Sequence, residues 1–222
     1  WYANSKSVKE KGLRFPRGMN YGLYNLWKED LFNKYKAFFL ITNDTVIQNK
    51  NTLKKLYRII LKNKKIGILS PCSKKWGENK LLKKNSIKFS WYIHNHAYLL
   101  NKDLLLKIIN PTSGYKNFLY DGSNFRGYGL ESELIAKAYA NNFAAAITNQ
   151  VYLEENEDYL LNYNDLIKTE NYSKNLQLSY EEGLKWMKRK YGFNNKWLLQ
   201  NYVKLFYDNF FINYPELKKF QI

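Results

Sequence analysis

Short runs of apolar residues alternate with amphipathic segments between about residues 18 and 153. A short apolar run is typical of a buried strand, and apolar residues spaced three and four apart indicate one face of a helix. Such alternation predicts an α/β domain with a largely parallel sheet. The expected strands are 37–41, 66–70, 89–100, 143–147 and 151–153, and the expected helices are 18–36, 51–63, 102–109 and 131–142.

The character of the chain changes after Glu154. A short acidic patch is followed by polar residues, and helical patterning dominates from Ser179 onward. We therefore predict an α/β domain over residues 1–158 and a helical C-terminal appendage over residues 159–222. Within the first domain, Pro71 is expected to end its strand because proline cannot donate a backbone hydrogen bond, and the Lys-rich stretch 74–88 is expected to be a surface loop.

The composition is that of a folded protein with a strong positive charge. Apolar residues make up 45% of the 222 residues, and the formal net charge is +17. Such a charge attracts phosphates of nucleic acids, lipids or nucleotides. The cations, however, are 31 Lys against 5 Arg and are spread along the whole chain, whereas specific phosphate recognition favours Arg. A basic nucleic-acid-binding module is thus an alternative, but nucleic acid is the less favoured partner.

Cysteine content and hydropathy bear on the compartment. Cys72 is the only cysteine, which excludes an intramolecular disulfide. No apolar run reaches the ~18 residues that span a bilayer. These observations predict a cytoplasmic protein, with a peripheral contact at the cytoplasmic face of a membrane as an alternative.

Two segments place carboxylates where an α/β sheet binds ligands, at the carboxyl ends of strands. Asp44 directly follows the apolar run 37–41, and Glu131 and Glu133 open the helix expected at 131–142. Asp44 fits either a turn or a ligand of a hard cation that bridges a diphosphate. The two glutamates fit either a helix N-terminus, where acidic residues favour the dipole, or a general base beside an acceptor hydroxyl.

The order of these segments resembles that of the family 2 glycosyltransferases, which are inverting enzymes of the GT-A fold. The resemblance runs from about Gly18 to Asp158. GMNYGL resembles the segment that opens the helix beside the donor nucleotide, and FFLITNDTVI resembles the strand that carries the DxD-type signature. KIGILSPCS and AYLLNKDLLLKI resemble the following strands, and FRGYGLESELIAKAYANNF resembles the region of the Glu-Asp-x-Asp motif.

The resemblance implies a three-layer α/β/α domain that lacks its N-terminal strands, and transfer of a single sugar from a nucleotide-sugar donor to a glycan or lipid-linked acceptor. It implies that Glu131 is the catalytic base and that Asp44 holds a divalent cation, Mn or Mg. It places Asn20, Asn43 and Asp44 on the donor side. Arg17, just before Gly18, fits either a diphosphate contact on that side or a solvated loop residue. Thr42 and Leu130 stand where the family usually has acidic residues, so a catalytically inactive GT-A domain acting as a binding subunit is an alternative.

Near the acceptor side, the resemblance places Trp91, His94, His96 and Glu133. On a strand, His94 and His96 would share one face and could bind sugar hydroxyls, with Trp91 stacking on a sugar ring. Packing of this strand against the core explains the same residues. A zinc site is not supported, because the sequence offers no further histidine and only one cysteine as additional ligands.

Overall fold

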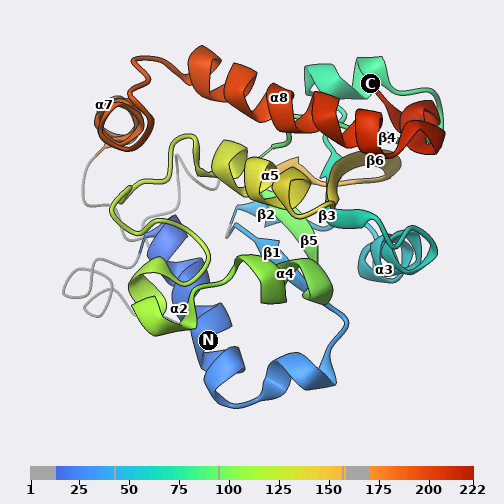
Figure 1. Ribbon diagram of the computed structural model, residues 1–222, viewed down its shortest axis with the longest axis horizontal. Coiled ribbons are helices and arrows are strands. Elements are labelled where there is room, and N and C mark those ends of the chain that lie inside the picture. The colour runs from blue at the N-terminus through green and yellow to red at the C-terminus, as the bar shows by residue number, and fades with distance from the viewer. Residues whose placement is uncertain (1–13, 43, 95, 157, 159–170) are drawn as a thin grey trace. The chain divides into compact units, whose positions relative to one another are not determined.

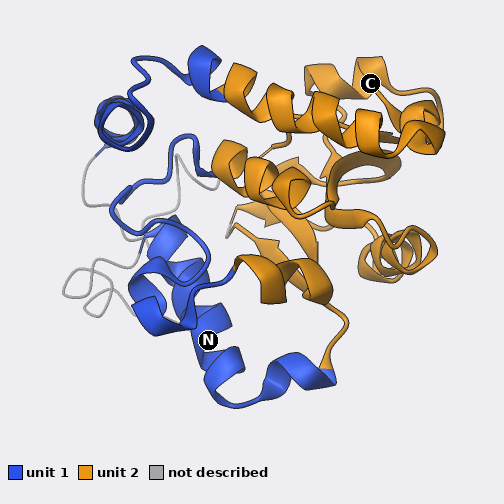
Figure 2. Ribbon diagram, in the orientation of Figure 1, with its two compact units in different colours: residues 1–34, 109–130, 157–199 blue, residues 35–108, 131–156, 200–222 orange. Residues whose placement is uncertain are grey.

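The computed structural model describes residues 14–42, 44–94, 96–156, 158 and 171–222. It divides into two compact units, which Figure 2 shows in two colours. Unit 1 comprises residues 1–34, 109–130 and 157–199, and unit 2 comprises residues 35–108, 131–156 and 200–222.

Unit 2 contains a five-stranded mixed sheet with the order β1-β5-β3-β6-β4, seen at the centre of Figure 1. β5 pairs antiparallel with both β1 and β3, β3 pairs parallel with β6, and β4 pairs antiparallel with β6. Phe39 lies opposite Leu99 of β5, and Leu69 pairs with both Leu99 and Ala146. The strands are β1 (Ala37–Ile41), β3 (Ile66–Cys72), β4 (Ile87–Phe89), β5 (Ala97–Asn101) and β6 (Ala144–Tyr152), and β2 (Thr45–Val46) pairs antiparallel with β7 (Glu154–Glu155) in a separate ribbon.

The α/β class is confirmed, but the prediction of a mostly parallel sheet is wrong. Only the β3–β6 pair is parallel among the described strands. Because β5 is antiparallel to both β1 and β3, these two strands run in the same direction, and β6 shares it. The carboxyl ends of β1, β3 and β6 therefore lie at one edge of the sheet, and β5 begins at that same edge. This edge carries the candidate site.

The predicted strand 89–100 is interrupted, and this changes the sheet. Its two ends form β4 and β5, while residues 90–94 and His96 lie outside both strands. β4 and β5 run in the same direction, both opposite to β3 and β6, and the chain crosses from β4 at one end of the strand order to β5 between β1 and β3. His94 and His96 consequently do not share a strand face. Pro71 does not end β3 either, since it is paired with Thr148 inside the strand.

The helices of unit 2 lie close to their predicted ranges. In α3 (Thr52–Lys62), Leu56, Ile59 and Ile60 are buried, and the helix packs against β3 and β6. α4 (Lys102–Ile108) packs against β3 and β5. α5 (Leu130–Ala140) is the helix predicted at 131–142.

The C-terminal part of the chain completes the core of unit 2. From residue 200 onward, α8 (Lys196–Asn213) contributes Tyr207 and Phe210, whose rings contact Tyr139 of α5 at centroid distances of 5.5 and 5.3 Å. Phe220, in the 3-10 helix η5 (Pro215–Phe220), stacks on Phe89. Residues 200–222 therefore belong to the sheet unit. The predicted boundary at 158/159 does not coincide with either unit, because these aromatic side chains bury the end of the chain against β4 and α5.

Unit 1 is built from helices and short turns. It contains α2 (Phe15–Lys28), α7 (Tyr172–Tyr191) and the 3-10 segments η1 (Leu31–Lys34), η3 (Pro111–Ser113) and η4 (Tyr115–Asn117). The residues predicted as one helix over 18–36 thus divide between α2 and η1. Asp121 ties α7 to the 109–130 segment, since its Oδ2 accepts hydrogen bonds from Trp186 Nε1 at 3.0 Å and Lys190 Nζ at 2.9 Å.

Asp121 gives unit 1 a pH dependence. Although burial acts in the opposite direction, hydrogen bonds from Ser123, Trp186 and Lys190 hold the pKa of Asp121 well below its usual value of 3.8. A carboxylate with a lowered pKa stabilises the fold above its unfolded pKa, and this stabilisation is lost as the pH falls below about 3.8.

Candidate functional site

The turn after β1 is fastened to the start of β5. The backbone N–H of Thr42 donates to the carbonyl oxygen of His96 at 2.9 Å, and the hydroxyls of Thr42 and Thr45 lie 3.3 and 3.1 Å from the same oxygen. Asn156 N donates to the carbonyl oxygen of Asp44 at 2.8 Å, beside the β2–β7 ribbon. These bonds fix the backbone around Asp44. Its side-chain Oδ1 is buried and has no hydrogen-bond partner among the described residues.

His96 is a deeply buried titratable group at this edge, with an exposed fraction of 1%. Both ring nitrogens are buried and find no hydrogen-bond partner within the described part of the chain. Burial and the neighbouring His94 lower the pKa of His96, and the carboxylates of Asp44, Glu78 and Glu154 only partly oppose this shift. The structure therefore holds a neutral imidazole with two unused polar atoms close to Asp44.

A second pair lies beside His96. His94 Nε2 and Glu78 Oε1 are 2.6 Å apart, and both side chains are buried. The ring of Trp76 lies against both histidines, at a centroid distance of 5.9 Å from His96.

Glu154 anchors the end of β3 to β7. Its Oε2 accepts from Ser73 Oγ at 2.5 Å and its Oε1 accepts from Lys74 N at 2.8 Å. Glu154 and Ser73 are both buried. Because both carboxylate oxygens already accept hydrogen bonds from the chain, we assign Glu154 to the framework of the site. We call Asp44, Trp76, Glu78, His94, His96 and Glu154 the edge cluster.

The edge cluster brings three residues predicted as site residues together: Asp44, His94 and His96. The side-chain atoms of the edge cluster that remain for a ligand are the buried Oδ1 of Asp44 and the two ring nitrogens of the neutral His96. No group of three or more His, Cys, Asp or Glu side chains among the described residues has the geometry to hold a metal ion. A cation here would depend on Asp44 together with oxygens of a bound ligand, as Mg²⁺ commonly does with phosphates.

Titration of His96 predicts a specific pH dependence of stability. A histidine with a lowered pKa in the folded state stabilises the fold above its unfolded pKa, near 6.5, and the stabilisation is lost as the pH falls toward the folded pKa. We expect the free energy of unfolding to decrease from pH 7.5 to pH 5.5. Urea denaturation of the wild type and of His96→Gln checks this, because the variant should show a flatter profile. An unchanged pH slope in His96→Gln would contradict the assignment.

The predicted base, Glu131, lies in the first turn of α5 and is 3% exposed. The preceding Gly127 and Gly129 both have φ of +88°, in the left-handed region that favours glycine. Glu133 is also buried and forms an ion pair with Lys137, whose Nζ is 3.7 Å from Oε2. Neither Glu131 nor Glu133 is among the described residues whose charges shift the pKa of His96. Glu131 is positioned by α5, and its role as the base stays a prediction.

Arg17 and Asn20, which were predicted to lie on the donor side, belong to α2 in unit 1. Arg17 Nε donates to the carbonyl oxygen of Gly122 at 3.0 Å. Asn20 is fully buried; its Nδ2 donates to the carbonyl oxygens of Lys116 and Tyr120, and its Oδ1 accepts from the N–H groups of Leu119 and Tyr120. Both donors and both acceptor positions of the amide are used, so the prediction that Asn20 binds the donor is corrected to a structural role. Asn43, also predicted on the donor side, lies outside the described residues.

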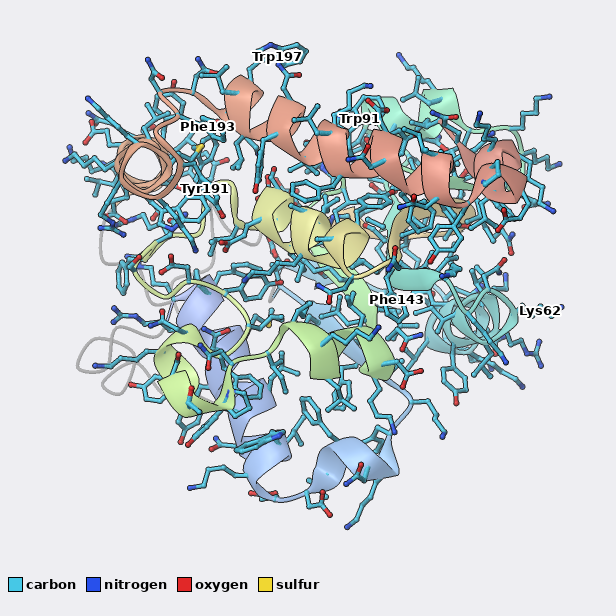
Figure 3. All side chains as sticks on the ribbon, viewed as in Figure 1. Lys62, Trp91, Phe143, Tyr191, Phe193 and Trp197 are labelled. Atoms are coloured by element: carbon cyan, nitrogen blue, oxygen red, sulfur yellow. The ribbon has the colours of Figure 1, made fainter. Side chains whose placement is uncertain are left out.

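Trp91 packs against α8 instead of the edge cluster (Figure 3). Its ring contacts Tyr207 at a centroid distance of 5.0 Å, and Lys204 Nζ lies 5.6 Å from the ring centroid. These contacts favour the packing interpretation of Trp91 over sugar stacking.

Cys72, at the end of β3, is buried at this edge. Desolvation, together with the charge of Glu78, raises the pKa of its thiol to about 12. Since the thiolate is the reactive form, we expect native Cys72 to resist a thiol reagent at pH 8 and to react at once in 6 M guanidinium chloride. Mass spectrometry of the iodoacetamide-treated protein measures this, and rapid labelling of the folded protein would contradict the structure.

Sequence reasoning missed Trp76, Glu78 and the framework role of Glu154. Trp76 and Glu78 lie in the Lys-rich stretch 74–88, where the only acidic residue and an adjacent tryptophan were the available signal. Glu154 was recognised only as part of an acidic patch. The hydrogen bonds that bury it become visible only when β7 is paired with β2.

Comparison with known proteins adds no family assignment: no protein-family model, curated protein or solved structure matches this chain. Among the described residues, no helix has the length and apolar character needed to span a membrane.

Proposed function

We propose that this protein is an inverting glycosyltransferase of the family 2 type, built on a GT-A-like α/β/α domain. The single observation that carries the proposal is Asp44. It directly follows β1, at the edge where β3 and β6 also end, and it has a buried carboxylate oxygen without a hydrogen-bond partner among the described residues. Ligands of α/β sheets bind at such edges, and a DxD-type carboxylate occupies this position in the family that the sequence resembles.

In this proposal, Asp44 binds the diphosphate region of a nucleotide-sugar donor. A divalent cation, Mn or Mg, fits the unused oxygen of Asp44 and would neutralise the charge of the departing diphosphate when bound. His96 contributes its two unpartnered ring nitrogens. Because the lowered pKa keeps the imidazole neutral, one nitrogen can donate a hydrogen bond and the other can accept one from a sugar hydroxyl.

The proposed reaction has one covalent step. The acceptor hydroxyl oxygen attacks the anomeric carbon, the bond from that carbon to the diphosphate oxygen breaks, and the nucleoside diphosphate leaves with the electron pair. Glu131 takes the hydroxyl proton as the general base. The family resemblance assigns this role. A buried carboxylate at the first turn of α5, after a loop with two glycines in the left-handed region, is consistent with it. The acceptor is a glycan or a lipid-linked glycan.

Release of nucleotide tests the proposal directly. The protein is incubated with UDP-, GDP-, dTDP- and CMP-sugars, with and without manganese, and the free nucleotide is measured by liquid chromatography. We expect one donor class to be cleaved, and Asp44→Asn to reduce cleavage by roughly 10²-fold or more, since it removes the charge that binds the diphosphate region. The exposed carboxylate of Asp103, in α4, supplies the control Asp103→Asn. No cleavage of any donor, or equal rates in the two variants, would contradict the proposal.

A further inference from the structure

β1 is an outermost strand of the sheet in unit 2. No other described strand pairs with its outer side, which we define as the side away from β5. The residues of β1 are Ala-Phe-Phe-Leu-Ile, without a proline or a charged residue, and its register with β5 contains no bulge. Natural proteins usually protect an outermost strand with one of these devices, because its unpaired backbone groups bind other strands. β1 has none of them.

The register of β1 shows which of its backbone groups face outward. In an antiparallel pair, residues that exchange hydrogen bonds alternate with residues whose N–H and C=O groups point away from the partner strand. Thr42 N donates to the carbonyl oxygen of His96 at 2.9 Å, which continues the register of the β1–β5 pair. The even-numbered residues of β1 therefore bond to β5. The backbone groups of the odd-numbered residues point to the outer side, and these residues are Ala37, Phe39 and Ile41.

An apolar groove of about 550 Å³ is lined by these strands and by the first turns of α3. Its apolar side chains are Ala37, Phe39 and Leu99 of the strands and Leu53 and Tyr57 of α3. Leu53 is 50% exposed, and Ile41, which shares a strand face with Phe39, is 38% exposed. Exposed apolar surface that is contiguous in this way marks an interaction site for another protein.

The polar part of the groove is positively charged. Lys50 and Lys54 line it at the N-terminal end of α3, and no carboxylate does. Neither ammonium has an ion-pair partner among the described residues. The first turn of α3 contains no acidic residue, so the helix dipole adds to the positive potential. An acidic partner matches this charge, whereas a second copy of the chain would bring its own net charge of +17.

We propose that β1 pairs with an extended segment of an acidic partner protein, which adds a strand to the outer side of the sheet. The outward backbone groups of β1 bind the main chain of this segment, and its alternate apolar side chains enter the groove. Acidic residues that flank these side chains meet the two lysines. The inference goes beyond the proposed glycosyltransferase activity and does not depend on it, because this binding uses neither Asp44 nor Glu131.

A fluorescent peptide, Glu-Glu-Ile-Thr-Ile-Thr-Ile-Glu-Glu, is the probe, and fluorescence anisotropy measures its binding to the full chain. Residues paired across two strands share a face, so the isoleucines that enter the groove are also those whose N–H groups bond to β1. N-methylation of the isoleucines removes these donors and keeps the side chains. We expect it to weaken binding about tenfold or more. A peptide with Lys in place of every Glu should also bind about tenfold more weakly.

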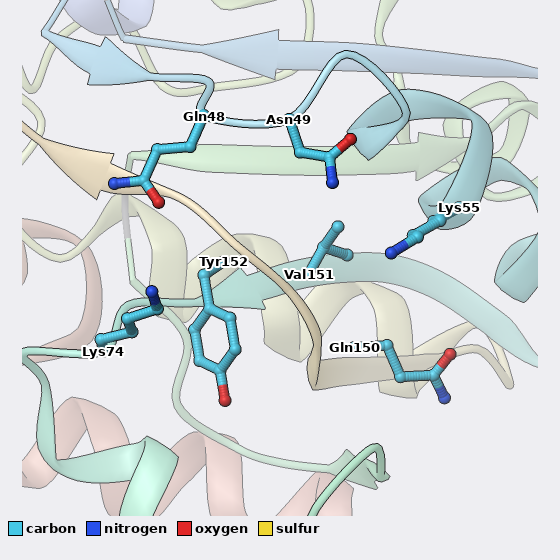
Figure 4. A pocket seen from close by; sticks show the side chains of 7 residues that line it. All are labelled: Gln48, Asn49, Lys55, Lys74, Gln150, Val151 and Tyr152. Carbon is cyan, nitrogen blue, oxygen red and sulfur yellow. The ribbon is translucent and has the colours of Figure 1, made fainter.

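Charge reversal in the protein tests the role of the lysines. Lys50→Glu combined with Lys54→Glu should weaken binding of the acidic peptide about tenfold and strengthen binding of the lysine peptide. Lys55→Glu combined with Lys62→Glu is the matched control, because it changes the net charge equally and both lysines are exposed residues of α3 outside the groove. Figure 4 shows Lys55 directed toward Val151 of β6. The control should change the affinity less than about threefold.

Amide hydrogen exchange, followed by NMR for each residue, tests the strand pairing itself. In the free protein, the N–H groups of Phe39 and Ile41 should exchange faster than those of Phe38 and Leu40, which bond to β5. The acidic peptide should slow exchange at Phe39 and Ile41. We expect Asp44→Ala to bind the peptide as the wild type does, so failure of this inference is distinguishable from failure of the proposed activity.

Three results would each overturn the proposal: no binding of the acidic peptide to the wild type, equal weakening by the two double variants, or unchanged exchange at Phe39 and Ile41 in the complex. A dimer seen by analytical ultracentrifugation and dissociated by the peptide would overturn it as well, because the outer side of β1 would then belong to a second copy of the chain.

Discussion

Replacing Glu131 by Gln is expected to reduce sugar transfer by 10²- to 10⁴-fold, the range that a general base typically contributes. The variant keeps the shape of the side chain but cannot accept the acceptor proton. Donor binding should stay within about twofold of the wild type, because the proposal assigns the diphosphate to Asp44. The readouts are the initial rate of nucleotide release in the presence of acceptor and the dissociation constant of the donor.

Glu133→Gln provides the matched control for this prediction. Glu133 lies in the same first turn of α5 and is buried to a similar degree, but it is paired with Lys137. We expect its loss to lower stability more than the rate of transfer. If both variants lost activity equally, or if Glu131→Gln lost donor binding together with transfer, the assignment of the base to Glu131 would be wrong.

Replacing Asn20 by Leu is expected to be the most destabilising single change in unit 1. The leucine would leave two backbone N–H groups and two carbonyl oxygens of residues 116–120 buried without their present partner. At 1–3 kcal/mol for each unsatisfied group, the loss of unfolding free energy should be about 4 kcal/mol or more. Urea denaturation measures it, and Asn20→Ser serves as a milder variant if the leucine form does not fold.

The exposed Asn33 supplies the control for this experiment. Among the described residues, its Nδ2 donates only to Asp30 Oδ1, just before η1. Asn33→Leu should change the unfolding free energy by less than about 0.5 kcal/mol, as surface substitutions usually do. Similar losses in Asn20→Leu and Asn33→Leu would show that the network around Asn20 is not formed.

The helices and the central strands could be predicted because their signals are local. α3 and β1 were predicted within one residue at each end, since the apolar spacing and its flanking polar residues mark where each element begins and ends. The position of β5 between β1 and β3 could not be predicted, because residues 90–94 and His96 lie outside both strands although the aromatic residues there are typical of a continuous strand. The placement of residues 200–222 depends on long-range ring packing around Phe89, for which periodicity carries no signal.

The residues of the candidate site also divide into those with a local signal in the sequence and those without one. Asp44 was identified because a carboxylate directly after a buried run is visible in the sequence. The contribution of Glu78 and Trp76 was not identified, since they are brought to His94 by a loop without periodicity. Asn20 was assigned to ligand binding from its place in a motif. Its actual role follows from four hydrogen bonds to a segment about a hundred residues away.

Thermal melting with nucleotides tests the central claim most directly. The full chain is heated in the presence of UDP, GDP, TDP or CMP, and of their sugar forms, with and without manganese, in parallel with Asp44→Ala. We predict that one nucleotide class raises the melting temperature, that manganese enlarges the shift, and that Asp44→Ala abolishes it, because only bound ligand stabilises the folded state. No shift with any nucleotide, or a shift that persists in Asp44→Ala, would contradict a nucleotide-sugar site at the end of β1.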